Sequence, residues 1–180
     1  MIRGALRLAI VGAGISYALD KILTQQAKGE PPEPISSMIV IDAPIERVWD
    51  MLADIDRQPE WMTEMKSLRV LTDGPIGVGT EAEAEVRILG ITVVDPVTIT
   101  EFDPPMRYAI RHDGQFTGTG VISLESGADL TTTIVRWDEQ LSPPVLPHLG
   151  ALVMTPALGA IFQADLERFK ELVETGSVAS

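Results

Sequence analysis

Hydrophobic and polar residues alternate through most of residues 67–141, which is the pattern expected of strands with one buried face. The alternation is most regular at 81–88, where Glu or Arg occupies each odd position and Ala, Val or Ile each even one. Segments rich in Gly, Pro and Asp interrupt it, and such segments are typical of tight turns. We therefore predict six antiparallel strands joined by short turns. They span residues 67–71, 81–88, 91–102, 106–112, 116–125 and 130–141.

Segments whose apolar residues recur at helical spacing lie on both sides of this block of strands. Residues 36–42 predict one more strand, and Pro44 then precedes apolar residues at 45, 48, 49, 52 and 55, which favours an amphipathic helix of about three turns. Pro59 interrupts that pattern, and a second short helix is expected around Trp61. A stripe of Leu, Phe and Val from Leu149 to Val173 predicts one long helix, which Pro156 should kink or break.

The first 34 residues differ from the rest of the chain. Residues 8–19 carry no charge, and as a helix they would span about 18 Å, less than the ~30 Å hydrocarbon core of a membrane. Three interpretations stay open: a helix on a membrane surface, a secretion signal, or a helix that packs on the domain or on a second copy. A linker with three Pro follows at 28–34. We assign 1–34 to the helix and linker, 35–174 to one domain, and 175–180 to a tail.

Composition and charge exclude several classes of protein. The chain has 14 Lys and Arg against 26 Asp and Glu, a net charge of −12, which argues against nucleic-acid binding. Residues 1–35 carry a net charge of +1 (4 basic, 3 acidic), so the remainder carries −13 (10 basic, 23 acidic). No Cys and only two His are present, so thiol catalysis and Cys-ligated metals are excluded and no metal is expected. Gly12 and Gly14 begin like a dinucleotide-binding fingerprint, but Tyr17 occupies the third glycine position, so no nucleotide cofactor is expected either.

Residues 35–173 resemble the START-like superfamily, which includes polyketide cyclase/dehydrase proteins and coenzyme-Q-binding START proteins. The most specific stretch is 41–61, where Ala-Pro after the strand, the Val-Trp pair and an Asp-x-x-x-x-Pro-x-Trp ending match the opening of that family. Weaker matches lie at 75–80 and 132–137. The resemblance implies an α+β helix-grip fold. In this fold a curved antiparallel sheet of about seven strands wraps around the long C-terminal helix and leaves a cavity between them, with two short helices after the first strand.

Strand parity indicates which residues would line such a cavity. Tyr108, Ile110 and His112 share one face of a strand, and two glycines on the next strand, Gly118 and Gly120, leave room for a ligand or let the sheet bend. Parity does not decide which face of the last strand is inside, and the resemblance favours Trp137 inward. The candidate ligand-binding residues are Trp61, Tyr108, Ile110, His112, Phe116, Val135, Trp137, Met154, Leu158 and Phe162.

Few titratable residues are candidates for chemistry. His112 lies beside Tyr108 and is the best single candidate for an acid or base, although a His that ends a strand in water next to Asp113 fits the sequence better. His148 and Glu139 are expected to be exposed to solvent. No catalytic residue is assigned.

The leading hypothesis is a carrier or binding protein for a hydrophobic small molecule such as a lipid, a quinone or a polyketide-like ring system. One alternative is a cyclase/dehydrase-type enzyme with a pocket His or Tyr as acid/base, and another is an interaction module with a closed cavity. The expected partner is an apolar ligand, with membrane contact through residues 1–23 and the oligomeric state left open. The expected location is the cytoplasm, with a membrane-associated helix or a secretion signal as open alternatives.

Overall fold

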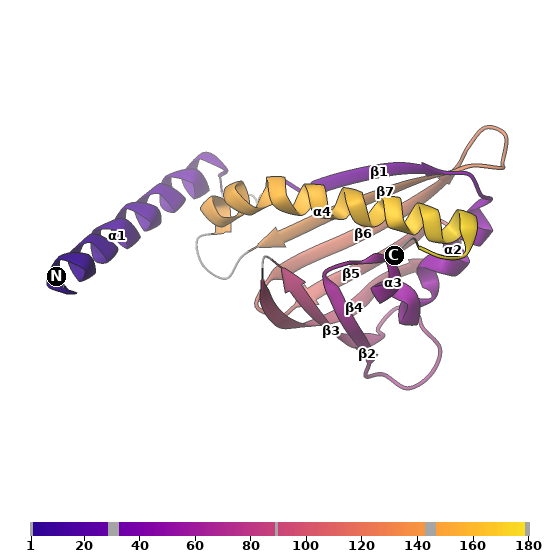
Figure 1. The fold of residues 1–180 in the computed structure, drawn as a ribbon, viewed down its shortest axis with the longest axis horizontal. Coiled ribbons are helices and arrows are strands. Elements are labelled where there is room, and N and C mark those ends of the chain that lie inside the picture. The colour runs from indigo at the N-terminus through magenta and orange to yellow at the C-terminus, as the bar shows by residue number, and fades with distance from the viewer. Residues whose placement is uncertain (1, 29–32, 89, 143–146, 179–180) are drawn as a thin grey trace.

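The computed structural model describes residues 2–28, 33–88, 90–142 and 147–178. Its centre is one seven-stranded antiparallel sheet with the order β1-β7-β6-β5-β4-β3-β2. A long helix, α4, runs along one face of this sheet, and two short helices lie near its C-terminal end (Figure 1). The strands are β1 (Ile35–Ile41), β2 (Met65–Val70), β3 (Glu81–Ile88), β4 (Ile91–Asp103), β5 (Arg107–Asp113), β6 (Thr117–Ser126) and β7 (Thr133–Ser142). The helices are α1 (Ile2–Gln26), α2 (Ile45–Ala53), the 3-10 turn η1 (Ile55–Arg57), α3 (Gln58–Trp61) and α4 (Pro147–Thr175).

This architecture confirms the expected α+β helix-grip fold. After β1 the chain passes through α2, η1 and α3, and then crosses the sheet strand by strand from β2 until β7 pairs with β1. Each neighbouring pair from β2 to β7 is consecutive in sequence, so hairpin connections join them, the longest being the loop of residues 71–80 between β2 and β3. The outward Glu and Arg residues of β3 alternate with the buried Ala82 and Ala84, as the sequence pattern predicts.

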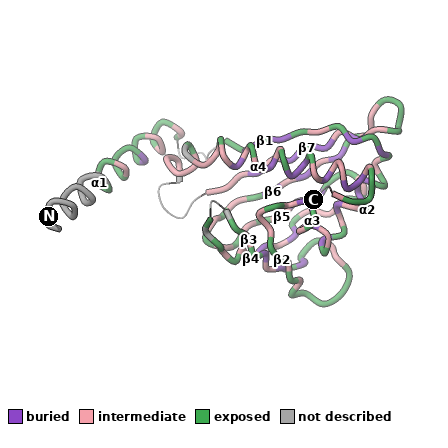
Figure 2. The backbone as a smooth tube through the Cα atoms, viewed as in Figure 1, coloured by how far each residue is buried: buried purple, intermediate pink, exposed green. Residues whose placement is uncertain are grey.

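The core forms where α4 and α2 cover the sheet. The inner face of α4 buries Leu158, Phe162, Leu166, Phe169 and Val173, and α2 buries a second, smaller apolar stripe against the same core. Because both helices bury one face and expose the other, their amphipathic spacing determines how they sit on the sheet. Figure 2 shows this division, with buried positions on the side of α4 that faces the strands.

Of the two outcomes predicted at Pro156, a kink or a break, the break does not occur. α4 continues through Pro156 as one helix of 29 residues. Pro156 has no N–H for the carbonyl of Leu152, and the hydroxyl of the preceding Thr155 donates to the carbonyl of Ala151 at 2.7 Å. Packing of the apolar face on either side therefore outweighs one missing backbone hydrogen bond.

Helix α1 extends away from the sheet, and only its C-terminal part contacts the domain (Figure 1). Asp20, which is 6 % exposed, accepts hydrogen bonds from the backbone N–H groups of His148 (3.0 Å) and Leu149 (2.9 Å), so it caps the first turn of α4. The hydroxyl of Thr24 lies 3.2 Å from Nδ1 of His148, which is half-buried in the first turn of α4, so the expectation that His148 is exposed is wrong.

Among the helices that the described residues form, none is both long and apolar enough to cross a membrane. The centre of the predicted linker, residues 29–32, and the last two residues of the predicted tail lie outside the described part of the chain.

Candidate ligand-binding cavity

A cavity lies between α4 and the sheet, with walls from β2 to β7, α3 and the middle of α4. Its volume is about 140 Å³. An apolar cavity of similar size, about 150 Å³, stays dry in water and binds benzene. Most of the wall consists of aliphatic, methionine and aromatic side chains, so the space suits an apolar molecule.

Eight of the ten residues proposed from the sequence line this cavity. They are Tyr108, Ile110, His112, Phe116, Trp137, Met154, Leu158 and Phe162. Trp61 and Val135 do not, because both are fully buried in the core. The ring of Trp61 packs edge-on against Trp137 and tilted against Phe169, with centroid distances of 6.1 and 4.7 Å. Trp61 therefore supports the cavity wall from behind through Trp137.

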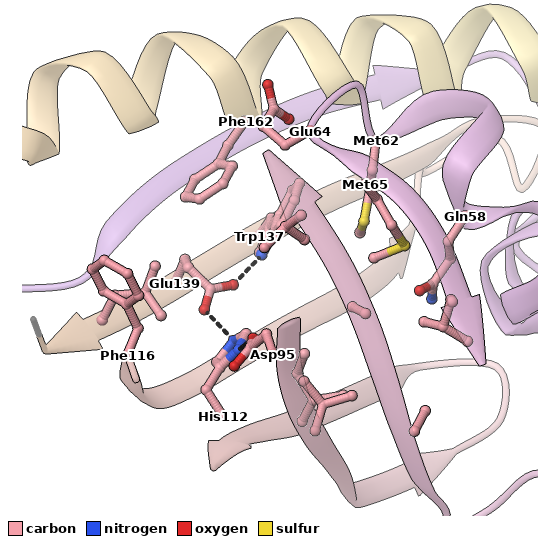
Figure 3. A pocket seen from close by; sticks show the side chains of 18 of the residues that line it. Gln58, Met62, Glu64, Met65, Asp95, His112, Phe116, Trp137, Glu139 and Phe162 are labelled. Carbon is pink, nitrogen blue, oxygen red and sulfur yellow. Dashed lines mark hydrogen bonds and ion pairs between the residues drawn. The ribbon is translucent and has the colours of Figure 1, made fainter. Parts of the chain in front are cut away.

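A buried charged cluster forms part of the sheet side of the cavity (Figure 3). His112 on β5 lies between two carboxylates, with Nδ1 at 2.6 Å from Asp95 of β4 and Nε2 at 2.8 Å from Glu139 of β7. The second carboxylate oxygen of Glu139 accepts a hydrogen bond from Nε1 of Trp137 at 2.8 Å. The side chains of His112, Asp95 and Glu139 are 12 %, 14 % and 4 % exposed. The expectations that His112 and Glu139 are solvated at strand ends are thus wrong.

The surroundings of His112 fix its charge. Burial alone would lower the pKa of His112, but the hydrogen bonds to Asp95 and Glu139 outweigh burial and raise this pKa to about 10. At neutral pH the ring is therefore an imidazolium whose two N–H groups both donate to carboxylates. Neither ring nitrogen then has a lone pair for a metal ion or for a substrate proton.

Two glycines make room for the carboxylates of this cluster. A Cβ added to Gly120, which pairs with Glu139 across β6 and β7, would lie 2.6 Å from a carboxylate oxygen of Glu139. A Cβ added to Gly114 would lie 2.5 Å from an oxygen of Asp95. Of the two glycines noted in the sequence, Gly120 therefore makes room for the buried cluster, because a side chain there would displace Glu139.

A second polar group lies where the loop before β2 meets α4. Asp165 of α4 is 1 % exposed, and its carboxylate accepts hydrogen bonds from the backbone N–H (3.0 Å) and hydroxyl (2.9 Å) of Thr63. Burial, together with a hydrogen bond shared with Glu64, raises the pKa of Asp165 to about 7. Glu64 and Asp165 both line the cavity.

Tyr108 is also held away from acid/base chemistry. Burial raises its pKa to about 12, and the hydrogen bond with Gln58 of α3 only partly opposes this rise. Gln58 is buried and lines the cavity beside Tyr108.

Sequence reasoning missed Gln58, Glu64, Asp95 and Asp165. Two of these carried a readable signal. Asp95 occupies the inward parity of β4 between Val93 and Val97, and Asp165 lies three residues after Phe162 on the apolar stripe of the last helix. A charged residue at an inward position is unusual and indicates a buried partner.

Comparison with known proteins agrees with this architecture. Residues 34–174 match the family described as polyketide cyclase/dehydrase and lipid transport. No protein of curated function matches the sequence.

Several solved structures share the fold. A protein from Deinococcus radiodurans is 22 % identical with a TM-score of 0.60, and the match covers 78 % of this chain and 96 % of that one. The Zhui aromatase/cyclase from Streptomyces sp. R1128 is 15 % identical with a TM-score of 0.59, covering 81 % and 98 %. A START superfamily protein from Mycobacterium smegmatis is 15 % identical with a TM-score of 0.54, covering 76 % and 99 %. Since the family match spans the whole helix-grip domain, this chain belongs to the polyketide cyclase/dehydrase and lipid-transport family.

Proposed function

We propose that this protein binds a hydrophobic small molecule in the cavity between α4 and the sheet and acts as a carrier for it. The observation that carries the proposal is the cavity itself, which has an almost entirely apolar wall and a few buried polar groups. Transfer of a ligand into such a wall gains about 25 cal/mol for each Å² of apolar surface removed from water. The family described for this chain includes lipid transport, which supports the same function.

The alternative of an acid/base enzyme is less well supported by the polar groups of the cavity. A general acid or base works best when its pKa lies near the working pH. The pKa values of His112 and Tyr108, the two residues considered for this role from the sequence, are about 10 and about 12, far from neutrality. Asp165 has a pKa of about 7, but its carboxylate is engaged by the backbone N–H and hydroxyl of Thr63. The presence of an open cavity also speaks against an interaction module with a closed core.

The test is mass spectrometry of an organic extract from the natively purified full chain. The Val86→Phe variant fills part of the cavity from β3, and Val94→Phe is its control, because Val94 is 55 % exposed on the neighbouring strand and does not line the cavity. We expect a stoichiometric apolar compound on the wild type and on Val94→Phe, and a reduced amount on Val86→Phe. Equal amounts on all three would place the compound elsewhere. An empty extract combined with no binding of 1-naphthalenemethanol in a calorimetric titration would overturn the proposal.

We also propose that α1 lies on an anionic membrane surface. Ile15, Leu19 and Ile22 follow helical spacing and are 64 %, 43 % and 51 % exposed, so they form an apolar stripe. The same helix carries Arg3, Arg7 and Lys21, which suit negatively charged head groups. A carrier anchored in this way would stay close to the membrane that supplies or receives its ligand.

A further inference from the structure

The charged residues of the cavity wall are almost all acidic. Glu64, Asp95, Glu139 and Asp165 line it, and His112 is the only cationic side chain among the described lining residues. Neither Lys nor Arg occurs among those residues. The wall therefore differs from an anion site, in which Arg or Lys faces the ligand.

The charges inside this wall do not cancel. The imidazolium of His112 neutralises one of its two carboxylate partners, so the cluster with Asp95 and Glu139 keeps a net charge of −1. The pair of Glu64 and Asp165 adds at least one more negative charge above neutral pH. Figure 3 shows Glu64 near α4 and the His112 cluster on the sheet, so the negative charge lies on two sides of the space.

This charge acts strongly because three of its four carboxylates are buried: the side chains of Asp95 and Glu139 are 14 % and 4 % exposed, and Asp165 is 1 % exposed. Two unit charges interact about twenty times more weakly in bulk water than in a dry interior, and an effective dielectric constant of about 20 suits a protein site. At that value, one like charge at about 8 Å weakens binding by more than tenfold. A cation of the same size gains by a comparable factor.

We infer that the cavity selects neutral or cationic hydrophobic ligands and rejects hydrophobic anions, including carboxylic acids with long or ringed apolar parts and phosphate esters. The inference rests on the proposed binding function and specifies the class of ligand. It follows from the sign of the wall charge and from the shortage of cationic side chains, and it concerns the same cavity.

Three probes with one ring system separate the effect of charge from that of apolar burial. 1-Naphthalenemethanol is neutral, 1-naphthylmethylamine is a cation at pH 8, and 1-naphthoate is an anion. Binding of each to the full chain is measured by calorimetry at pH 8 and 0.15 M salt. Both charged probes lose hydration on entering the cavity, so the ratio of their affinities reports the sign of the field inside it. We expect the cation to bind at least tenfold more tightly than the anion, with the alcohol also bound.

Variants distinguish the cavity from the acidic outer surface. Asp165→Asn removes one negative charge from the wall while its amide oxygen can still accept from Thr63. Glu125→Gln removes the same charge from an exposed position on β6. We expect the cation-to-anion ratio to fall severalfold in Asp165→Asn and to stay unchanged in Glu125→Gln.

The outcomes separate the inference from the function beneath it. If the alcohol binds and the anion binds as tightly as the cation, the selectivity is wrong while the binding function stands. An equal fall of the ratio in both variants would assign the preference to surface charge, which also contradicts the inference. If no probe binds, the proposed binding function itself fails.

Discussion

At the scale of single residues, His112 is the most unusual side chain of the molecule, because an ionised ring is buried between two carboxylates. Its pKa in the folded chain, about 10, lies above the ordinary value of 6.5. The stability that this proton contributes is therefore complete below about pH 6.5 and is lost as the pH rises toward 10. Part of this contribution therefore remains at physiological pH, where the cluster still links β4, β5 and β7.

This charge state is directly measurable by nitrogen NMR. We expect both ring nitrogens of His112 to stay protonated through pH 8, with loss of the proton only near pH 10. The chain has two His, so the assignment needs a single variant, His148→Gln. A His112 signal that titrates near pH 6.5 would show that the ring is neutral at physiological pH, and it would restore His112 as a candidate acid/base.

Gly120 tests whether the cluster depends on close approach of the backbone. In Gly120→Ala the new Cβ would lie 2.6 Å from a carboxylate oxygen of Glu139, so this side chain must move away from His112. Overpacking of this kind costs about 1–3 kcal/mol, and we expect a loss in that range from urea unfolding. Gly77→Ala is the control, because a Cβ there meets nothing within 4 Å and should change stability little. Equal stability of the two variants would mean that the cluster tolerates a side chain beside it.

From the sequence, the direction of a side chain could be predicted where it depends on alternation within a single strand. The parity of β5 correctly predicts that Tyr108, Ile110 and His112 face inward. It cannot predict the charge of His112, because the two partners come from other strands, 17 and 27 residues away. Whether the lining residues bind a ligand stays a prediction.

At the scale of elements, Asp165 joins α4 to the loop before β2 at a cost in stability. An unfolded carboxyl ionises near pH 4, whereas Asp165 in the fold keeps its proton up to about pH 7. The folded state therefore loses stability, relative to the unfolded state, as the pH rises from about 4 to 7, and the penalty persists above pH 7. We expect Asp165→Asn to stabilise the protein by about 2–4 kcal/mol more at pH 8 than at pH 4.

Urea unfolding at the two values of pH measures this difference. Asp50→Asn, on the exposed face of α2, serves as the control for loss of a carboxylate. A gain for Asp165→Asn that is equal at both values of pH would show that the carboxyl ionises normally in the fold. Asp165 would then impose no pH-dependent stability penalty that the substitution to Asn could remove.

Asp20 links two helices that are far apart in the sequence. Because its carboxylate caps the first turn of α4, Asp20→Ala should cost about 1 kcal/mol in urea unfolding. Asp20→Asn keeps an acceptor oxygen for the same N–H groups and should retain most of the stability. If Asp20→Ala unfolds like the wild type, the contact between α1 and α4 contributes nothing to the fold.

The strands and helices could be predicted from periodicity, and their contacts across long distances could not. Alternation over 81–88 and the apolar stripe after residue 148 lead to β3 and α4 almost directly. The cap on α4 could not be predicted, because Asp20 lies far from α4 in the sequence and there only marks the polar end of an apolar segment. At Pro156 local propensity predicts a kink or a break, and the break is absent because α4 packs on the sheet on both sides of this residue.

At the scale of the whole molecule, the resemblance correctly predicts the fold, and the cavity determines what that fold can do. A helix-grip chain can close its interior or leave it open, and residue types alone do not decide between the two. Here the space is open, its wall is apolar, and the charges in it are mostly negative. The outer charge has the same sign, since residues 36–180 carry a net −13 and the N-terminal segment +1.

This separation of charge gives the last prediction, for the membrane contact of α1. An anionic surface repels the acidic domain and attracts the basic helix, so α1 should be the element that touches lipid. In flotation experiments we expect the full chain to rise with vesicles that contain phosphatidylglycerol and much less with pure phosphatidylcholine. Higher salt should weaken the association, because head-group attraction is screened.

The apolar stripe of α1 supplies the matched variants. Ile15→Glu with Leu19→Glu should abolish flotation, since both side chains are exposed and their loss leaves the fold intact. Val78→Glu with Val94→Glu adds the same charge at exposed apolar positions of the domain and should leave flotation unchanged. If the wild type does not float but dimerises with rising concentration, and the α1 variant stays monomeric, the stripe binds a second copy. The membrane proposal would then be wrong, because the stripe would be covered by the second copy.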